Sequence, residues 1–214
     1  MQTIAAISTP PGKGGIAVIR VSGERAIAVA DGVFRAKSGK KLREIRPRTA
    51  VFGEICDPRT GETIDSGECV AYFAPHSYTG EDTVELSCHG GTLVTTTVLS
   101  ACFAAGAVQA GPGEFTKRAF LSGKLSLTEA EAVGLLIDAD TEEKRRLSSS
   151  VVRGVTTRAI ERLDEGLFSV MTALYAAIDY PEEDVGDEGE RTIRGVVAET
   201  LSGVERLLAT YKTG

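Results

Sequence analysis

The sequence lacks several features that would assign a function directly. It has no tryptophan, and aromatic residues make up 6% of its 214 residues, which argues against base stacking as the purpose of its main surface. It contains no Gly-x-x-x-x-Gly-Lys-Ser/Thr, Gly-x-Gly-x-x-Gly, Gly-x-Ser-x-Gly or His-Glu-x-x-His motif. No apolar run is long enough to cross a membrane. The apolar N-terminus has no basic segment before it, so we expect no signal peptide.

Thiols and imidazoles are few and scattered. The four cysteines show no Cys-x-x-Cys spacing and there are two histidines, so we predict reduced, packed thiols in a cytoplasmic protein, with no metal site. Cys88 and His89 are adjacent, which leaves two interpretations open. They form a catalytic or metal-binding pair, or they point to opposite faces of a strand.

The charge is unevenly distributed. The chain carries 24 basic and 30 acidic residues, a net charge of −6. Residues 1–120 are close to neutral, whereas residues 121–214 hold most of the acidic excess. One stretch, residues 35–48, has seven basic side chains against Glu44 alone. It is either a phosphate-contacting surface or a solvated loop.

Residues 1–120 alternate between two kinds of pattern. Apolar, β-branched runs predict strands at 3–8, 16–22, 49–56, 64–73, 83–88 and 107–110. Helical spacing predicts helices over 24–34 and 93–105, and the turn residues at 57–61 predict a hairpin. This mixture indicates an α+β domain with a mixed sheet.

The pattern after residue 125 is helical. A helix is predicted to begin near Thr128, which together with Glu131 fits a capping box. Residues 141–180 contain no proline and keep an apolar stripe, which predicts one helix of about 60 Å. An acidic loop at 182–190 and a helix at 192–211 follow. We therefore predict two domains, residues 1–120 and 121–214, the second an all-α partial helical bundle.

Three predicted loops combine glycine with charge, at residues 10–15, 77–82 and 113–124. Arg20 and Glu85 lie in the strands that follow the first two, within otherwise apolar runs. A charge in such a run is costly unless it is paired or used. Either the two residues form an ion pair with each other, or they bind a ligand.

Four long segments resemble the N-terminal part of the MnmE (TrmE) family of bacterial tRNA-modification GTPases. They are TPPGKGGIAVIRVSG (9–23), SYTGEDTVELSCHGG (77–91), GPGEFTKRAFLSGKLSLTEAEAV (111–133) and AAIDYPEEDV (176–185). The resemblance implies that the first domain is similar to the folate-binding domain of aminomethyltransferases. It also implies that this domain binds tetrahydrofolate and forms a homodimer.

The resemblance also implies a cofactor site and partners. Family folate contacts fall on Arg20, Glu85 and Lys124, with 5-formyltetrahydrofolate or another one-carbon tetrahydrofolate as ligand. In that family a flavin-dependent partner, MnmG (GidA), acts with the GTPase on C5 of the wobble uridine of tRNA, adding an aminomethyl-type group. The full-length protein uses GTP, Mg²⁺ and K⁺.

The family places its GTPase motifs just beyond the point where this chain stops. The chain is thus expected to be a fragment, with no catalytic residue of its own. Two alternatives stay open, a free-standing folate-dependent one-carbon transferase and a pure dimerisation module.

Overall fold

The computed structural model describes residues 1–179 and 186–211. Contacts divide the chain into two compact units, unit 1 from Met1 to Leu125 and unit 2 from Ser126 to Gly214. Unit 1 is a sheet with helices, and the described part of unit 2 is helical. The predicted class, an α+β domain followed by a helical region, is confirmed.

Unit 1 contains a seven-stranded sheet in the order β3-β4-β5-β6-β2-β1-β7. All neighbours pair antiparallel except β1 and β7, which pair parallel, so the sheet is mixed as predicted. The strands are β1 (Ile4–Ile7), β2 (Gly14–Ser22), β3 (Phe34–Ala36), β4 (Val51–Cys56), β5 (Thr63–Tyr72), β6 (Thr83–Gly90) and β7 (Val108–Gln109). The predicted hairpin is the β4–β5 pair.

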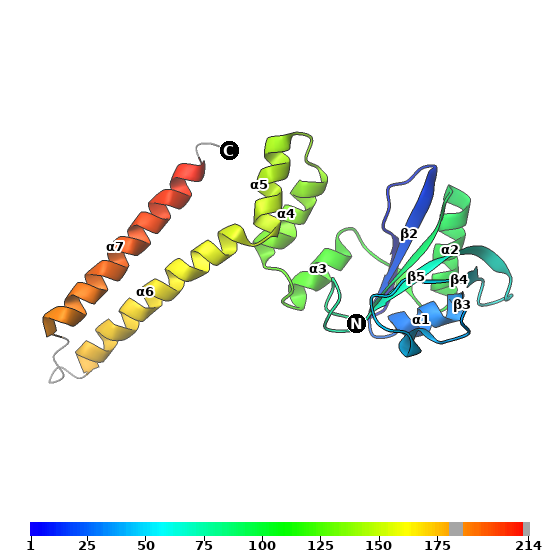
Figure 1. Cartoon of the computed structure of the whole chain (residues 1–214), viewed down its shortest axis with the longest axis horizontal. Helices are drawn as coiled ribbons and strands as arrows, with labels where there is room; N and C mark the ends of the chain where they lie inside the picture. Colours follow the sequence, from blue (N-terminus) through cyan, green and yellow to red (C-terminus); the bar gives the residue numbers. More distant parts are fainter. Residues whose placement is uncertain (180–185, 212–214) are drawn as a thin grey trace. The chain divides into compact units, whose positions relative to one another are not determined.

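The core lies on one face of the sheet. Alternate residues of β2 and β6, such as Ile19, Val21, Val84 and Leu86, are completely buried. Helices α1 (Ala26–Val33) and α2 (Thr92–Ala104) pack against this face and contribute to the same cluster (Figure 1). The opposite face of the sheet, which we call the open face, carries the polar residues that alternate with the core residues.

Two segments of unit 1 predicted as loops are partly regular. The basic stretch 35–48 includes most of β3 and a short 3-10 helix, η1 (Leu42–Glu44). The charged segment 113–124 contains helix α3 (Glu114–Leu121). The many charges of this segment favoured a loop in the sequence analysis. In the structure two of them, Glu114 and Arg118, pair across one helical turn and do not remain in solvent.

Unit 2 begins with the helical hairpin α4 (Leu127–Ile137) and α5 (Glu142–Val152). The capping box lies two residues earlier than predicted. Ser126 accepts from the backbone N–H of Glu129, and the Glu129 carboxylate accepts from the backbone N–H of Ser126. The prediction of Thr128 and Glu131 was wrong because Leu127 is already helical.

The prediction of one helix over 141–180 was also wrong. The chain breaks between α5 and α6 (Val155–Asp179) at Gly154, which has φ +66. This left-handed conformation suits glycine, and a Cβ there would collide with the Glu129 carboxylate. A helix can therefore end within a segment that contains no proline.

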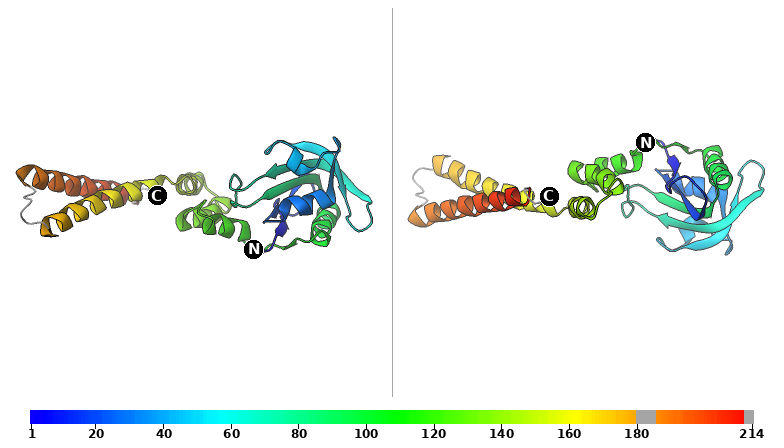
Figure 2. Two further views of the ribbon diagram at one scale, coloured as in Figure 1. Left: turned by 90° about the horizontal axis from the view of Figure 1, so that it is seen from below. Right: turned by 90° about the horizontal axis from the view of Figure 1, so that it is seen from above.

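Helices α6 and α7 (Gly186–Tyr211) lie side by side (Figure 2). Gly203 allows this approach, since a Cβ there would lie 2.6 Å from Leu163 Cδ2. Helix α7 begins six residues earlier than predicted, so residues 186–190 are helical and not loop. The rest of that predicted loop, 182–185, lies outside the described residues.

Candidate functional site

Arg20 and Glu85 lie directly opposite each other on neighbouring strands, β2 and β6. The guanidinium donates twice to one carboxylate oxygen, from Nε at 2.9 Å and from Nη2 at 2.7 Å to Oε1. Each side chain is 26% exposed. The open face thus holds a half-buried ion pair, which is the pairing that the sequence left open as one of two alternatives.

Aromatic side chains surround this pair. The Arg20 guanidinium carbon lies 5.4 Å from the ring centroid of Tyr78 and 5.6 Å from that of Phe115. Tyr72, on β5, donates to Glu85 Oε2 at 3.4 Å. Burial raises the pKa of the Tyr72 hydroxyl and the Glu85 carboxylate raises it further, so the phenol keeps its proton.

The third predicted residue, Lys124, follows α3 and is exposed. Its side-chain stem passes beside Gly80, where a Cβ would lie 3.6 Å from Lys124 Cγ. Gly80 has φ +79, and a Cβ there would also meet the Ser122 side chain at 2.7 Å. Lys124 therefore lies next to the loop that carries Tyr78, but no contact within the described residues joins it to Arg20 or Glu85.

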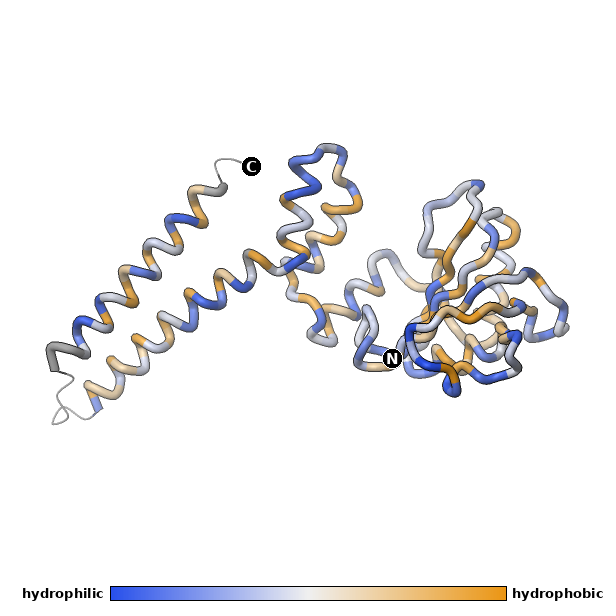
Figure 3. The backbone as a smooth tube through the Cα atoms, viewed as in Figure 1, coloured by the Kyte–Doolittle hydropathy of each residue, from blue (hydrophilic) through white to orange (hydrophobic). Residues whose placement is uncertain are grey.

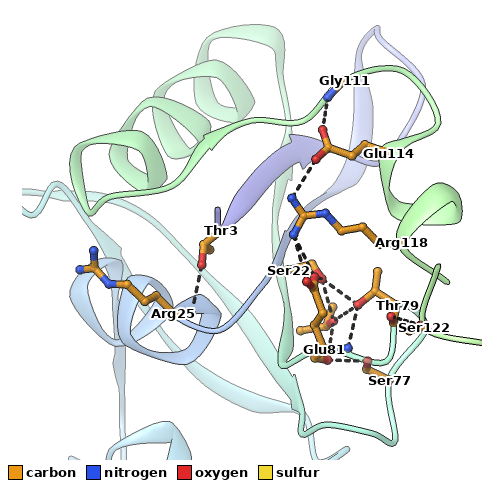
Figure 4. A network of polar contacts seen from close by, with 11 residues as sticks. Thr3, Ser22, Arg25, Ser77, Thr79, Glu81, Gly111, Glu114, Arg118 and Ser122 are labelled. Atoms are coloured by element: carbon orange, nitrogen blue, oxygen red, sulfur yellow. Dashed lines mark hydrogen bonds and ion pairs between the residues drawn. The ribbon is translucent and has the colours of Figure 1, made fainter. Parts of the chain in front are cut away.

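A buried arginine fixes the loop and α3 together (Figure 4). Arg118 is only 6% exposed and pairs with Glu81 at 3.0 Å and Glu114 at 2.8 Å. Burial opposes the charge, but the two carboxylates outweigh it and raise the pKa of Arg118 further. Sequence reasoning missed Arg118. The spacing of four residues from Glu114 was the available signal.

Hydroxyl groups complete the same network. Ser22 Oγ lies 2.7 Å from Thr79 Oγ1, and both residues are fully buried (Figure 4). Ser122, at the end of α3, donates to the Thr79 carbonyl at 2.6 Å. These hydrogen bonds thus connect β2, the loop before β6 and the end of α3, next to the Arg20–Glu85 pair.

The three predicted glycine loops lie in two different parts of unit 1. Loop 10–15 lines a cavity of about 580 Å³ together with Gly90 and residues at the start of α2. Gly14 pairs with Gly90, and a Cβ on Gly90 would lie 2.7 Å from the Gly14 carbonyl oxygen. Loops 77–82 and 113–124 instead meet at the Arg20–Glu85 pair. The glycines beside the cavity permit close strand pairing there.

Cys88 and His89 do not act together. Cys88 is buried in the core, and burial raises the pKa of its thiol to about 11. His89 lies on the other face, where Nδ1 is 2.8 Å from the Asp65 carboxylate. No group of three potential metal ligands occurs within residues 1–179 and 186–211. The interpretation with opposite faces is the one the structure supports.

The fold and the two family matches define a class. The family model for the "GTP-binding protein TrmE N-terminus" matches residues 3–124, and that for the "MnmE helical domain" matches residues 127–214. The chain therefore pairs an N-terminal domain of the TrmE type with the helical domain that accompanies it.

Curated relatives narrow this class. The chain is similar to the tRNA modification GTPase MnmE of Moorella thermoacetica, with 45% identity over 215 residues, covering 100% of this chain and 46% of the relative. It is 47% identical over 210 residues to a protein of the same name from Thermus thermophilus, covering 98% and 47%. The chain belongs to the MnmE (TrmE) family of tRNA-modification GTPases. It spans about half the length of these relatives.

Within the part of the chain that the structure describes, no helix combines the length and the apolar character needed to cross a membrane.

Proposed function

We propose that this chain is the tetrahydrofolate-binding and homodimerising region of a tRNA-modifying GTPase. The observation that supports it most is the half-buried Arg20–Glu85 pair on β2 and β6, which is flanked by the aromatic rings of Tyr78 and Phe115. Such a pair offers charge, hydrogen bonding and planar apolar surface at one place, which is what a heteroaromatic ligand with polar edges requires.

Glu85 is proposed to hold the pterin ring. Its Oε1 is occupied by Arg20, whereas the one contact of Oε2 within the described residues is the long bond from Tyr72. Oε2 therefore has a lone pair left to accept a charge-assisted hydrogen bond from a ring N–H of a pterin. Arg20 orients that carboxylate, and Tyr78 and Phe115 supply apolar surface for the ring.

Lys124 is proposed to meet the glutamate tail of the folate. Its ammonium is exposed beside Gly80, on the loop that also carries Tyr78. A flexible cation at the rim suits the carboxylates of a tail that stays in contact with water. When bound, the folate would supply a one-carbon unit, and the residues of this chain would hold and orient it. We assign no catalytic residue.

The activity of the whole protein extends this proposal. It would bind GTP with Mg²⁺ and K⁺ through segments other than those described, and act in the cytoplasm. With the flavin-dependent MnmG (GidA) protein it would add an aminomethyl-type group to C5 of the tRNA wobble uridine. The names of the curated relatives, which are tRNA modification GTPases, support this role.

Isothermal titration calorimetry with 5-formyltetrahydrofolate tests the site. We expect the chain to bind and Glu85→Ala to lose affinity by about 10- to 100-fold, because a charge-assisted hydrogen bond to the pterin disappears. Glu68→Ala is a matched control, since Glu68 is an exposed carboxylate of the same sheet. Sedimentation of each variant tests dimerisation separately. Equal affinities for all three proteins, or no binding to any, would contradict the assigned pocket.

A further inference from the structure

A second hollow lies at the other edge of the sheet, over β3 and β4. Its volume is about 290 Å³, and Arg35, Lys37, Phe52, Glu54 and Ser66 line it. Arg35 is paired in register with Glu54, and the Lys37 backbone N–H donates to the Phe52 carbonyl at 3.0 Å. Because side chains alternate along strands, these residues share the open face. None of them belongs to the proposed folate site.

The aromatic ring of this hollow is unusually open. Phe52 is 53% exposed, whereas Phe34 on the neighbouring strand is 4% exposed in the core. Gly53 allows β3 to lie close to β4, since a Cβ there would collide with the Arg35 carbonyl. Arg35 and Lys37 line the same hollow as this exposed ring. A planar π system can stack on such a ring while its charged substituents meet the cations.

The stretch 35–48 next to the hollow is basic and its charges are largely unpaired, whereas the hollow itself also holds Glu54, and Glu68 lies opposite Phe52 on β5. Of the seven basic residues in 35–48, only Arg43 has an ion pair within the described residues, to Asp82 at 2.9 Å. The acid of this stretch, Glu44, is used to cap η1, where it accepts from the Lys41 backbone N–H at 2.8 Å. Exposed cations without ion pairs there are Arg35, Lys37, Lys40, Lys41, Arg46 and Arg48. Such a cluster is complementary to a polyanion.

We propose that this hollow binds one nucleotide of a single-stranded RNA segment, with its base stacked on Phe52 and its flanking phosphates at Lys37 and Arg35. The strand must be single because a base in a duplex already stacks on its neighbours and cannot offer its face. A second copy of the chain fits less well, since a twofold contact here would bring two basic stretches together. The choice of RNA rests on the proposed role in tRNA modification.

Fluorescence anisotropy of this chain with a labelled 12-nucleotide oligouridine tests the stacking. We expect Phe52→Ala to weaken binding by roughly tenfold, which is the loss of one stacked base. Phe52→Tyr keeps a stacking ring, so its affinity should stay within about twofold of the unchanged chain. Comparison of these two variants separates the aromatic face from mere filling of the hollow.

A salt titration tests the phosphate contacts. The slope of log affinity against log salt concentration should fall by about 0.7 in Lys37→Gln, the value for one phosphate contact on a single strand. Lys117→Gln is the matched control, because Lys117 is a lysine of α3 in the same unit, outside the basic stretch. It should leave the slope unchanged.

Four results would overturn the proposal. These are no binding by the unchanged chain, equal affinity of Phe52→Ala and the unchanged chain, equal salt slopes for the two lysine variants, and equally strong binding of a 12-base-pair duplex. Loss of a dimer in Phe52→Ala with RNA affinity unchanged would assign the ring to a self-interface instead. Calorimetry with 5-formyltetrahydrofolate should give the same affinity for Phe52→Ala, so failure of this site is distinguishable from failure of the folate site.

Discussion

The two units of the chain bury their apolar residues very differently. In unit 1, β-branched and small side chains of the sheet, α1 and α2 form one cluster with many members completely inaccessible. In unit 2, the buried apolar residues within the described part are Ala132 and Val170. Large side chains such as Phe168 and Ile178 are about 70% exposed. Apolar and polar residues alternate along α6 and α7 (Figure 3).

This contrast shows where the free energy of folding resides. A sheet covered by helices satisfies its backbone and buries side chains within one unit, so each core residue counts toward stability. A pair of antiparallel helices buries only the seam between them, and the remaining apolar surface stays in water. We therefore expect unit 1 to be the stable unit and unit 2 to respond weakly to loss of apolar side chains.

The largest expected effect comes from one substitution made in both units. Leu86→Ala removes a completely buried side chain from β6 and should lower the free energy of unfolding of unit 1 by about 3 kcal/mol. Leu208→Ala, on α7, removes a side chain that is 63% exposed and should cost less than about 0.5 kcal/mol. Hydrogen exchange of β6 and α7 peptides across a urea series measures both. Similar costs would mean that α7 is buried in solution.

The next largest difference between the two units is expected in the stability cost of breaking an ion pair. Arg118→Ala should destabilise unit 1 by about 2 to 3 kcal/mol, because Glu81 and Glu114 lose a partner that is almost completely buried. Arg145→Ala, in α5, breaks a solvent-exposed pair with Glu142 and should leave stability almost unchanged. The same exchange measurement compares them.

Arg118→Lys is the control for this pair. A lysine keeps the charge but cannot form both contacts in the fork geometry of a guanidinium, so an intermediate loss is expected. If Arg118→Ala were as mild as Arg145→Ala, the network of Figure 4 would not hold the loop to α3.

The sequence predicted unit 1 better than unit 2, and the reasons are local. Strand alternation around Arg20 and Glu85 marked both residues, because a charge inside an apolar run is visible without knowing the fold. Their mutual pairing could not be decided, since it depends on the register of β2 against β6. The exposure of Phe52 could not be predicted, because it depends on which face of β4 the helices cover.

In unit 2 the errors concern helix ends. The apolar stripe continues through residue 154, so periodicity alone predicted one helix where the structure has two. The break depends on the left-handed backbone of Gly154 and on its contact with Glu129, which belongs to another helix. Local patterns report the face of a helix more reliably than they report its ends.

The smallest expected effect tests one of those ends. Ser126→Ala removes the hydroxyl that accepts from the Glu129 N–H at 3.2 Å, and should destabilise α4 by about 1 kcal/mol. Thr128→Ala removes the hydroxyl that the sequence pattern favoured and should cost less than about 0.3 kcal/mol, because Thr128 is already inside the helix and exposed. Amide hydrogen exchange of α4 residues measures the stability cost of both substitutions. A larger cost for Thr128→Ala would restore the later helix start, and with it the sequence-based position of the capping box.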